Sequence, residues 1–307
     1  MEQGNKRLAT LVGCNYFNTR NELHGCINDV QSMHKVLIER FGFKPDNIEI
    51  LTDAPDSPVM PTGANIRQAL RQMVDRAEPG DVLFFHYSGH GTLIPAVKPH
   101  HGSKAKRDEA IVPCDFNLVT DVDFRQLVDR LPPGVSFTII SDSCHSGGLI
   151  DKEKEQIGPS TVNDQNTPLH RAKTIPYEHI LQHVSSLSSI DSQHIGDHLL
   201  NIFGPDASAK FSDKDAVLVH PDNGILLSGC QTNETSADMS PNEEGGKAYG
   251  AFSNSIQLVL QEEENVMSNK EIVVKARKLL RKQGFGQHPC LYCSDVNADA
   301  PFLWQLE

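Results

Sequence analysis

Two residues that could perform chemistry together each follow an apolar run. The stretch "FFHYSGHG" places His90, and "FTIISDSCHSGG" places Cys144, where an expected strand gives way to a glycine-rich turn. A thiolate attacks a carbonyl carbon far better than a thiol does, and a nearby imidazolium lowers the pKa of a cysteine. The imidazole can then protonate a leaving amine. The pair therefore predicts nucleophilic catalysis.

The turns around this pair could also supply an oxyanion site. The backbone N–H groups of Gly91 and Cys144 lie in glycine-rich turns that let the main chain approach a substrate. The alternative is structural: an inert core cysteine and a hydrogen-bonded turn histidine. Two matched turns, each flanked by Gly and Ser, favour the catalytic interpretation.

The elements that must position these residues alternate along the first half of the chain. Apolar runs predict strands at 7–13, 47–53, 81–91 and 135–144, with amphipathic helices between them, one capped by Thr62 and one starting near Asp121. Such alternation predicts an α/β fold with a mostly parallel sheet and helices on both faces. Ligands bind outside the carboxyl ends of parallel strands, so His90 and Cys144 are expected to reach one crevice.

The second half of the chain begins with a polar stretch, after which strand and helix patterns return. Residues 152–222 are rich in polar residues and Pro, with a modest helical pattern near 178–203, which predicts a surface connector. A strand in "NGILLSGCQ", a helix in "GAFSNSIQLVLQ" and a helix with a Ser268–Glu271 capping box follow. The expected organisation is a large segment, 1–151, a connector, 152–222, and a small segment, 223–307, that completes the same sheet.

Composition narrows the functional classes. The 307 residues carry a formal net charge of −12 and a pI near 5.6, which argues against nucleic acid as a partner. No apolar run has the length of a signal peptide or a membrane span, so no membrane association is expected. The seven cysteines are odd in number and scattered, which is typical of reduced thiols in the cytosol.

Several long motifs identify a family. "HYSGHG" and "DSCHSGG", together with "GCINDV", "DEAIVPCDFN" and "SGCQTNETSAD", closely resemble the metacaspases, cysteine proteases of the caspase-like clan. A connector between two segments resembles the type II, plant-type form. The resemblance implies a caspase-like fold with p20-like and p10-like segments. It also implies a His90–Cys144 dyad, 144 − 90 = 54 positions apart, that cleaves peptide bonds after Arg or Lys.

A basic specificity also has a reason in the residues themselves. Asp142 lies two positions before Cys144, and Asp29 stands at an expected helix start, with Cys26 and Ser88 as further pocket walls. Two carboxylates can hold a guanidinium by charge-assisted hydrogen bonds. Asp29 has the alternative of being a helix-terminal charge, because negative groups are favoured there.

The connector contains a candidate processing site. Type II metacaspases mature by cutting themselves after a basic residue, and Lys173 in "LHRAKTIPYEH" matches that pattern, with Arg171 as the alternative. The resemblance therefore implies a zymogen whose fragments, 1–173 and 174–307, stay associated as a monomer. The alternative for Lys173 is an ordinary exposed basic residue.

Calcium is not expected to be required as a cofactor. Many metacaspases bind it, and the matching positions here are the weak candidates Asp108, Asp121, Asp123 and Asp151. Val122 interrupts the acidic run, and the loop at 97–109 is basic. A hard cation needs six to eight oxygen ligands, which these residues remove or repel. The chain resembles the calcium-independent branch that is active at mildly acidic pH.

Other features leave alternatives open. Cys290 and Cys293 could form half of a zinc site with His288, or a redox pair, although buried cysteines near the last strand are the favoured interpretation. A pseudoenzyme scaffold and a non-peptide cysteine hydrolase are rival functions. The family resemblance implies protein or peptide substrates, protein inhibitors as partners, and a role in programmed cell death or stress-related proteolysis. It adds nuclear or extracellular release to the cytoplasmic location.

Overall fold

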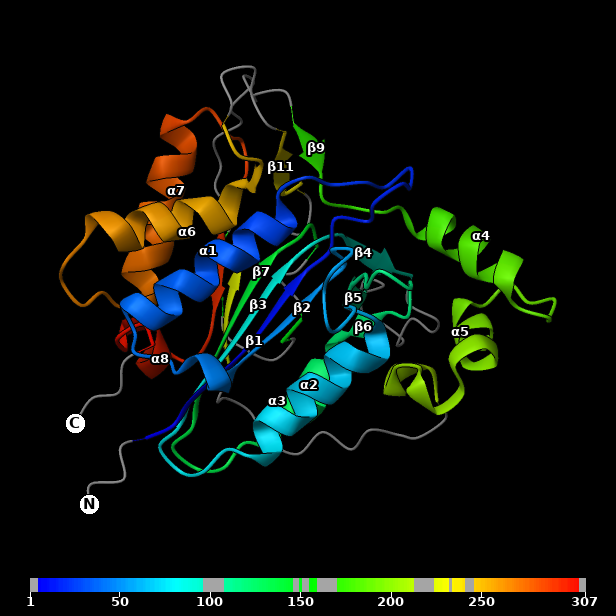
Figure 1. The fold of residues 1–307 in the computed structure, drawn as a ribbon, viewed down its shortest axis with the longest axis horizontal. Coiled ribbons are helices and arrows are strands. Elements are labelled where there is room, and N and C mark those ends of the chain that lie inside the picture. The colour runs from blue at the N-terminus through cyan, green and yellow to red at the C-terminus, as the bar shows by residue number, and fades with distance from the viewer. Residues whose placement is uncertain are drawn as a thin grey trace, which may run out of the picture.

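A seven-stranded sheet forms the centre of the computed structural model, which describes residues 5–95, 108–145, 149–150, 155–158, 170–212, 224–231, 234–240 and 246–303. The strand order is β2–β1–β3–β7–β10–β13–β8, and the first five strands are parallel (Figure 1). β13 and then β8 add antiparallel. The strands are β1 Arg7–Gly13, β2 Ile48–Thr52, β3 Val82–Ser88, β7 Ser136–Asp142, β8 Glu155–Ile157, β10 Gly224–Ser228 and β13 Cys290–Tyr292. This mostly parallel sheet confirms the predicted α/β class.

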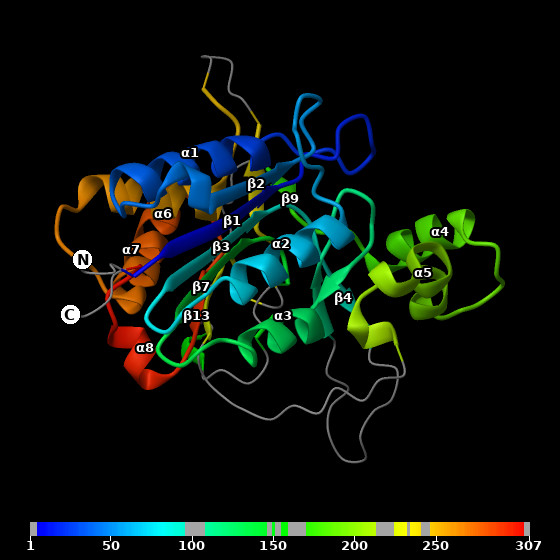
Figure 2. The same ribbon diagram turned by 60° about the horizontal axis from the view of Figure 1, so that its bottom comes forward.

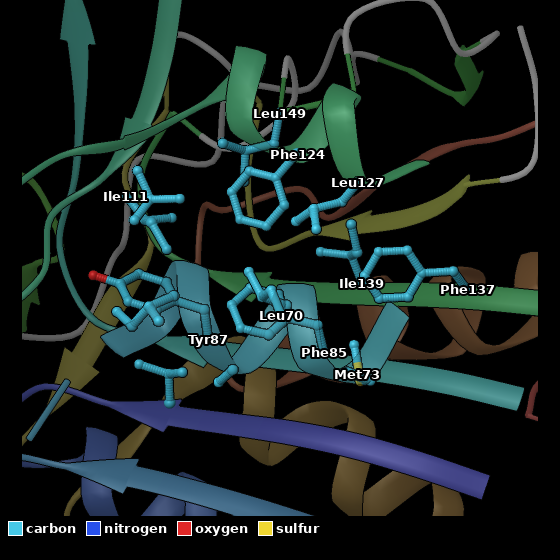
Figure 3. Packing of buried hydrophobic residues seen from close by; sticks show 14 of the residues in the cluster. Leu70, Met73, Phe85, Tyr87, Ile111, Phe124, Leu127, Phe137, Ile139 and Leu149 are labelled. Atoms are coloured by element: carbon cyan, nitrogen blue, oxygen red, sulfur yellow. The ribbon is translucent and has the colours of Figure 1, made fainter. Parts of the chain in front are cut away.

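Helices cover both faces of this sheet, as predicted (Figures 1 and 2). Side chains of α1, α6 and α7 form one buried cluster with one face, and side chains of α2 and α3 form another with the opposite face. Figure 3 shows the second cluster, in which Leu70 and Phe124 pack near Phe85 and Ile139. The helices are α1 Cys26–Glu39, α2 Gly63–Asp75, α3 Asp121–Val128, α6 Ala251–Glu262, α7 Asn269–Lys282 and α8 Asp295–Asp299, with a 3-10 turn, η1, at Pro45–Asn47.

Local sequence signals set the helix starts. The Thr62 side chain accepts a hydrogen bond from Asn65 N at the start of α2. Ser268 and Glu271 form the predicted capping box at the start of α7. Such caps satisfy backbone N–H groups that have no partner within the helix. Burial on both faces explains why β3 is apolar along almost its whole length: all seven of its residues are buried.

The described part of the polar connector, 155–158 and 170–212, holds more structure than its composition indicates. β8 joins the edge of the main sheet. Helices α4 Tyr177–Leu187 and α5 Ile195–Phe203 bury Ile180, Val184 and Leu199 in a third cluster with Ile94 and Ala110. Those two residues belong to a small sheet of β4 Gly91–Ile94, β5 Asp108–Ile111 and β6 Val119–Thr120, and the 3-10 turns η2 Gly204–Asp206 and η3 Ala209–Phe211 follow α5.

A second small sheet carries the segment that matters for the site. It consists of β9 Arg171–Ala172, β11 Ala237–Met239 and β12 Tyr249–Gly250, with β11 in the middle and both neighbours antiparallel to it. Arg171 pairs with Asp238, and Ala172 pairs with Ala237. Connector and small segment are therefore joined here by strand pairing. Within the described residues, none of the helices combines the length and the apolar character needed to cross a membrane.

Candidate active site

The sheet brings the two candidate catalytic residues to one edge. β3 and β7 are parallel neighbours in a register that pairs Ser88 with Asp142, so both strands end at the same level. His90 and Cys144 each follow two residues later, and they are 3% and 0% exposed. The expected convergence of the two strand ends is present, but the site is closed to solvent.

The segment that closes the site is the connector itself. Lys173 is completely buried, and its main-chain carbonyl oxygen accepts hydrogen bonds from Gly91 N at 3.0 Å and Cys144 N at 3.1 Å. These are the two N–H groups that the sequence predicts for an oxyanion site. The Lys173 N–H donates to Ser236 O at 2.9 Å. The chain thus runs through the site with the carbonyl group of Lys173 held by the backbone N–H of Cys144.

The Lys173 side chain enters a pocket made by the four predicted residues. Its Nζ lies 3.2 Å from Asp142 Oδ2, 3.6 Å from Asp29 Oδ2 and 2.8 Å from Ser88 Oγ. Ser88 Oγ in turn donates to Asp29 Oδ2 at 2.7 Å. Buried Cys26 completes the set, because its thiol lies close enough to Lys173 for the two to interact electrostatically. The pocket matches a single cationic side chain.

Charge and burial act against each other in this pocket. Burial raises the pKa of Asp29 to about 8, although Lys173 and the N–H and O–H donors oppose that shift. Burial also disfavours the charged form of Asp142, but Lys173, Ser236 and Ser253 outweigh it and lower its pKa. Burial alone would lower the pKa of Lys173, but the carboxylates, Asp142 foremost, raise it. A charged Lys173–Asp142 pair results.

Thiol and imidazole are held by main-chain groups. Ser236 N donates to Cys144 Sγ at 3.0 Å. His90 Nε2 lies 2.7 Å from Asn21 O, and the ring packs on Tyr16 at a centroid distance of 4.7 Å. Burial lowers the pKa of His90 to about 4, against the opposing effect of Asn21 O. A neutral imidazole in this closed form can accept a proton.

Comparisons with known proteins place these features in a family. Residues 6–301 match the family described as Caspase domain. Metacaspase-9 of Arabidopsis thaliana is 59% identical, with 98% of this chain and 97% of that protein covered. The chain is a metacaspase of type II. Metacaspase-6 of Arabidopsis thaliana is 41% identical over 96% of this chain and 99% of its own length. As a member of this family, the protein is a cysteine-type peptidase.

Solved structures support the fold. Protein GSU0716 from Geobacter sulfurreducens matches with a TM-score of 0.65 and 20% identity, covering 98% of this chain and 100% of that one. Caspase-1 from Spodoptera frugiperda matches with a TM-score of 0.51 and 10% identity, covering 94% and 86%. The predicted caspase-like fold is therefore confirmed.

The calcium candidates that the structure describes in this metacaspase already have protein partners, and two of them are paired with cationic side chains. Lys210 Nζ lies 2.6 Å from Asp108 Oδ2 and 3.7 Å from Asp121 Oδ1, and Arg125 pairs with Asp121 at 3.3 Å. Asp123 instead accepts from Thr120 N at 2.8 Å, within the capping box of α3. Asp151 lies outside the described residues. The carboxylates that can be placed are thus engaged with protein groups.

The cysteine pair near the C-terminus has protein partners too. Cys290 and Cys293 are both buried, and Cys290 Sγ donates to His288 O at 3.4 Å. His288 Nδ1 lies 2.6 Å from Glu234 Oε1. Among the described residues, no group of three or more His, Cys, Asp or Glu has the arrangement of a metal site.

Two pocket residues were not singled out by the sequence. Ser236 Oγ donates to Asp142 Oδ1 at 2.5 Å, while its main chain contacts both Cys144 and Lys173. Gly250 leaves room for the pocket contents, because a Cβ at this position would collide with Lys173 Nζ and with both carboxylates. Ser236 lies in the quoted motif "SGCQTNETSAD", but loop residues have no periodicity that would show which side chain faces a pocket.

Proposed function

We propose that this metacaspase is an endopeptidase that cleaves after Lys or Arg and is made as a zymogen. The observation that carries the proposal is Lys173, whose ammonium sits between Asp29 and Asp142 while its carbonyl accepts from Gly91 N and Cys144 N. Donors at that position stabilise the oxyanion that forms when a thiolate attacks. The connector is then the first substrate, and Lys173 rather than Arg171 is the cut residue, because Arg171 donates instead to Glu22 O outside the pocket.

The proposed chemistry assigns one role to each residue. Cys144 Sγ attacks the carbonyl carbon of Lys173, and the C–N bond to Thr174 breaks to give a thioester. His90 takes the proton of the Cys144 thiol as the sulfur attacks and delivers it to the departing amine. Water then hydrolyses the thioester. An external substrate with Lys or Arg before its scissile bond would enter the same pocket, since two carboxylates suit an ammonium or a guanidinium.

Mildly acidic pH is proposed to favour activation. The pKa of His90 is lowered to about 4 because the closed site keeps the ring out of water. A displaced connector would restore hydration and allow the ring to charge nearer its ordinary value of about 6.5. Because protons then bind the open form more tightly than the closed form, a fall in pH shifts the population towards opening.

Calcium-independent activity is proposed on the contacts of Lys210. A calcium ion near Asp108 and Asp121 would meet the ammonium of Lys210 and the guanidinium of Arg125. Like charges repel, and calcium needs six to eight oxygen ligands. The protein partners proposed are substrates and inhibitors. The role in cell death or stress proteolysis stays a prediction from the family resemblance, and the cytoplasmic location stays a prediction from the cysteine content.

One experiment tests these proposals together. The full chain and its Cys144→Ala variant are incubated from pH 5 to 8 with calcium or with chelator, and peptides carrying a fluorophore after Arg, Lys or Asp report turnover. We expect a new N-terminus at Thr174, turnover after Arg and Lys in chelator, and neither in Cys144→Ala. Turnover that needs calcium would overturn the Lys210 argument alone, and turnover after Asp would overturn the pocket assignment.

A further inference from the structure

The peptide bond between Lys173 and Thr174 is held on both sides by contacts that do not depend on the bond. On one side, the Lys173 ammonium, N–H and carbonyl are each fixed, as described above. On the other side, Thr174 forms a parallel bridge with Gly91, and Ile175 N donates to Gly91 O at 3.1 Å. Breaking the bond removes none of these contacts.

Ile175 anchors the side that carries the leaving amine. Its side chain is 0% exposed and belongs to the cluster that contains Ile94, Ile180 and Val184. Pro176 comes next and fixes one backbone angle at the start of α4. Figure 1 shows the chain running from β9 along the end of β4 and into α4. A new amino group at Thr174 would therefore remain beside the carbonyl from which it was cut.

Water, in contrast, is kept out of this site. Cys144 and Lys173 are both 0% exposed, and His90 is 3% exposed. A thioester formed here would face a tethered amine before it faced a water molecule. Well-oriented neighbouring groups react with effective molarities of about 10⁵–10⁸ M, far above the concentration of water. Attack by the amine is thus favoured over hydrolysis for as long as the connector stays in place.

We infer that the metacaspase has a further activity, peptide ligation, by which the cut Lys173–Thr174 bond is rejoined in the same site; this inference rests on the proposed function. The Thr174 amine attacks the thioester carbonyl carbon, a C–N bond forms and the C–S bond breaks. Cys144 leaves as the thiolate, and the proton of the amine passes to the neutral His90. Where the Lys173 end is already a carboxylic acid, as in an isolated nicked chain, Cys144 Sγ first forms the thioester with release of one water, and the amine then displaces Cys144. No oxidant or other reactant is consumed.

Ligation in the closed site has two consequences. Self-cleavage reaches a balance between intact and cut chains, and stable opening requires α4 and the residues before it to leave the third cluster. Acceptor peptides should also be chosen by their second residue, because Ile175 makes the buried contact on that side. The preferred acceptor class is a peptide with a free amine and an aliphatic side chain in second place.

The test starts from the self-cleaved full chain, isolated in its nicked form, and follows intact mass. We expect the 307-residue chain to reappear, and the same intact-to-cut ratio to be reached from the intact side. With excess Thr-Ile-Pro-Tyr amide, fragment 1–173 should gain the peptide mass less one water. Thr-Asp-Pro-Tyr amide should react about tenfold more slowly, the change that loss of ~1.4 kcal/mol of burial produces.

Variants distinguish the effect of the buried Ile175 contact from a general loss of stability. Ile175→Asp should lower the recovered intact fraction about tenfold by the same conversion, and Ile175→Ala provides a milder change if the Asp variant does not fold. Val296→Asp, at a side chain 81% exposed on α8, should leave the fraction unchanged. Alkylation of the thiols should abolish rejoining.

A fluorogenic Lys peptide, which has no acceptor residues, is measured in parallel. Turnover of this peptide with neither chain recovery nor peptide addition would overturn ligation and leave the protease proposal standing. No turnover in the nicked protein would contradict both. A recovered fraction that is the same in Ile175→Asp as in the parent chain would overturn the anchoring argument.

Discussion

Ser236 connects the three parts of the candidate site. Its N–H donates to Cys144 Sγ, its carbonyl accepts from Lys173 N, and its hydroxyl donates to Asp142 Oδ1. The Gln287 side chain holds this segment in place, because it donates to Ser236 Oγ at 3.3 Å and accepts from Ala237 N at 2.9 Å. Main-chain contacts survive a change of side chain, so the hydroxyl can be tested separately from the rest.

Replacing Ser236 by Ala should weaken the pocket more than the chemistry. The variant loses one hydrogen bond to a charged carboxylate, worth about 1.5–3 kcal/mol, or roughly a 10–100-fold change in affinity. We expect KM for Lys and Arg peptides to rise in that range, with kcat changed much less. Ser255→Ala is the matched control, because that buried serine donates to Phe252 O in α6. An equal loss of kcat with constant KM would contradict the assignment.

Gly250 should tolerate no side chain while the pocket is filled. Its backbone φ of −77° is accessible to any residue, so only space forbids a Cβ beside Lys173 Nζ. Crowding of this kind costs about 1–3 kcal/mol, or roughly 5–150-fold in binding. Gly250→Ala is expected to lower kcat/KM for Lys peptides by that factor. The melting temperature of the variant shows whether the fold is retained, and unchanged kcat/KM would mean that the pocket can widen.

At the scale of elements, β9 is the strand on which the closed site depends. It consists of two residues, Arg171 and Ala172, and is held by pairing with β11 and by the side chain of Lys173 that follows it. An ammonium buried between two carboxylates is costly unless all the partners are present. Removing the cation leaves both carboxylates buried without their counter-ion.

Lys173→Met should therefore abolish self-cleavage and destabilise the chain by about 3–5 kcal/mol, the usual cost of breaking a buried pair from one side. Without the ammonium, the pKa of Asp29 rises further above its value in the unfolded chain, and the pKa of Asp142, which Lys173 holds low, rises as well. A group whose pKa is higher in the folded state than in the unfolded state contributes stability at low pH, and this stability is lost as the pH rises. Urea unfolding should thus show a smaller deficit at pH 5 than at pH 8.

Lys173→Arg serves as the control for that variant. A guanidinium keeps the positive charge, so the cut after residue 173 and most of the stability should be retained. A deficit in Lys173→Met that does not change between pH 5 and pH 8 would show that the carboxylates do not depend on this cation.

The sequence predicted the strand ends much better than it predicted β9. Buried parallel strands give long apolar runs, so the positions of His90 and Cys144 at the ends of β3 and β7 follow from pattern and from the parallel-sheet rule. A two-residue strand such as β9 has no such pattern. Its place depends on long-range contacts with Ser236 and the pocket, which neighbouring residues do not encode. The connector helices α4 and α5 were predicted only as a modest helical pattern for a similar reason. Each buries few apolar residues, and these pack on β4 and β5, which lie far away in the sequence.

At the scale of the whole molecule, the closed form buries titratable groups that only an open or unfolded chain can hydrate. His86 is 0% exposed in β3, with Nε2 2.9 Å from Ser253 Oγ, and burial lowers its pKa to about 3. Its nearest charges act in opposite senses, since Asp142 raises the pKa and Lys173 lowers it. The folded protein therefore keeps this histidine neutral where the unfolded chain would protonate it.

This difference predicts that acid destabilises the fold through His86. A lowered folded pKa gives stability that is fully present above about pH 6.5 and is lost as the pH falls towards the folded value. Relative to His86→Gln, the parent chain should lose about 1.4 kcal/mol of unfolding free energy per pH unit between pH 6 and pH 4, because one extra proton binds on unfolding. Both proteins are measured as Cys144→Ala variants, so that self-cleavage does not intervene. Exposed His194, replaced by Gln, is the matched control and should leave the slope as it is. Parallel slopes for the parent chain and His86→Gln would mean that the buried ring gains its proton without unfolding.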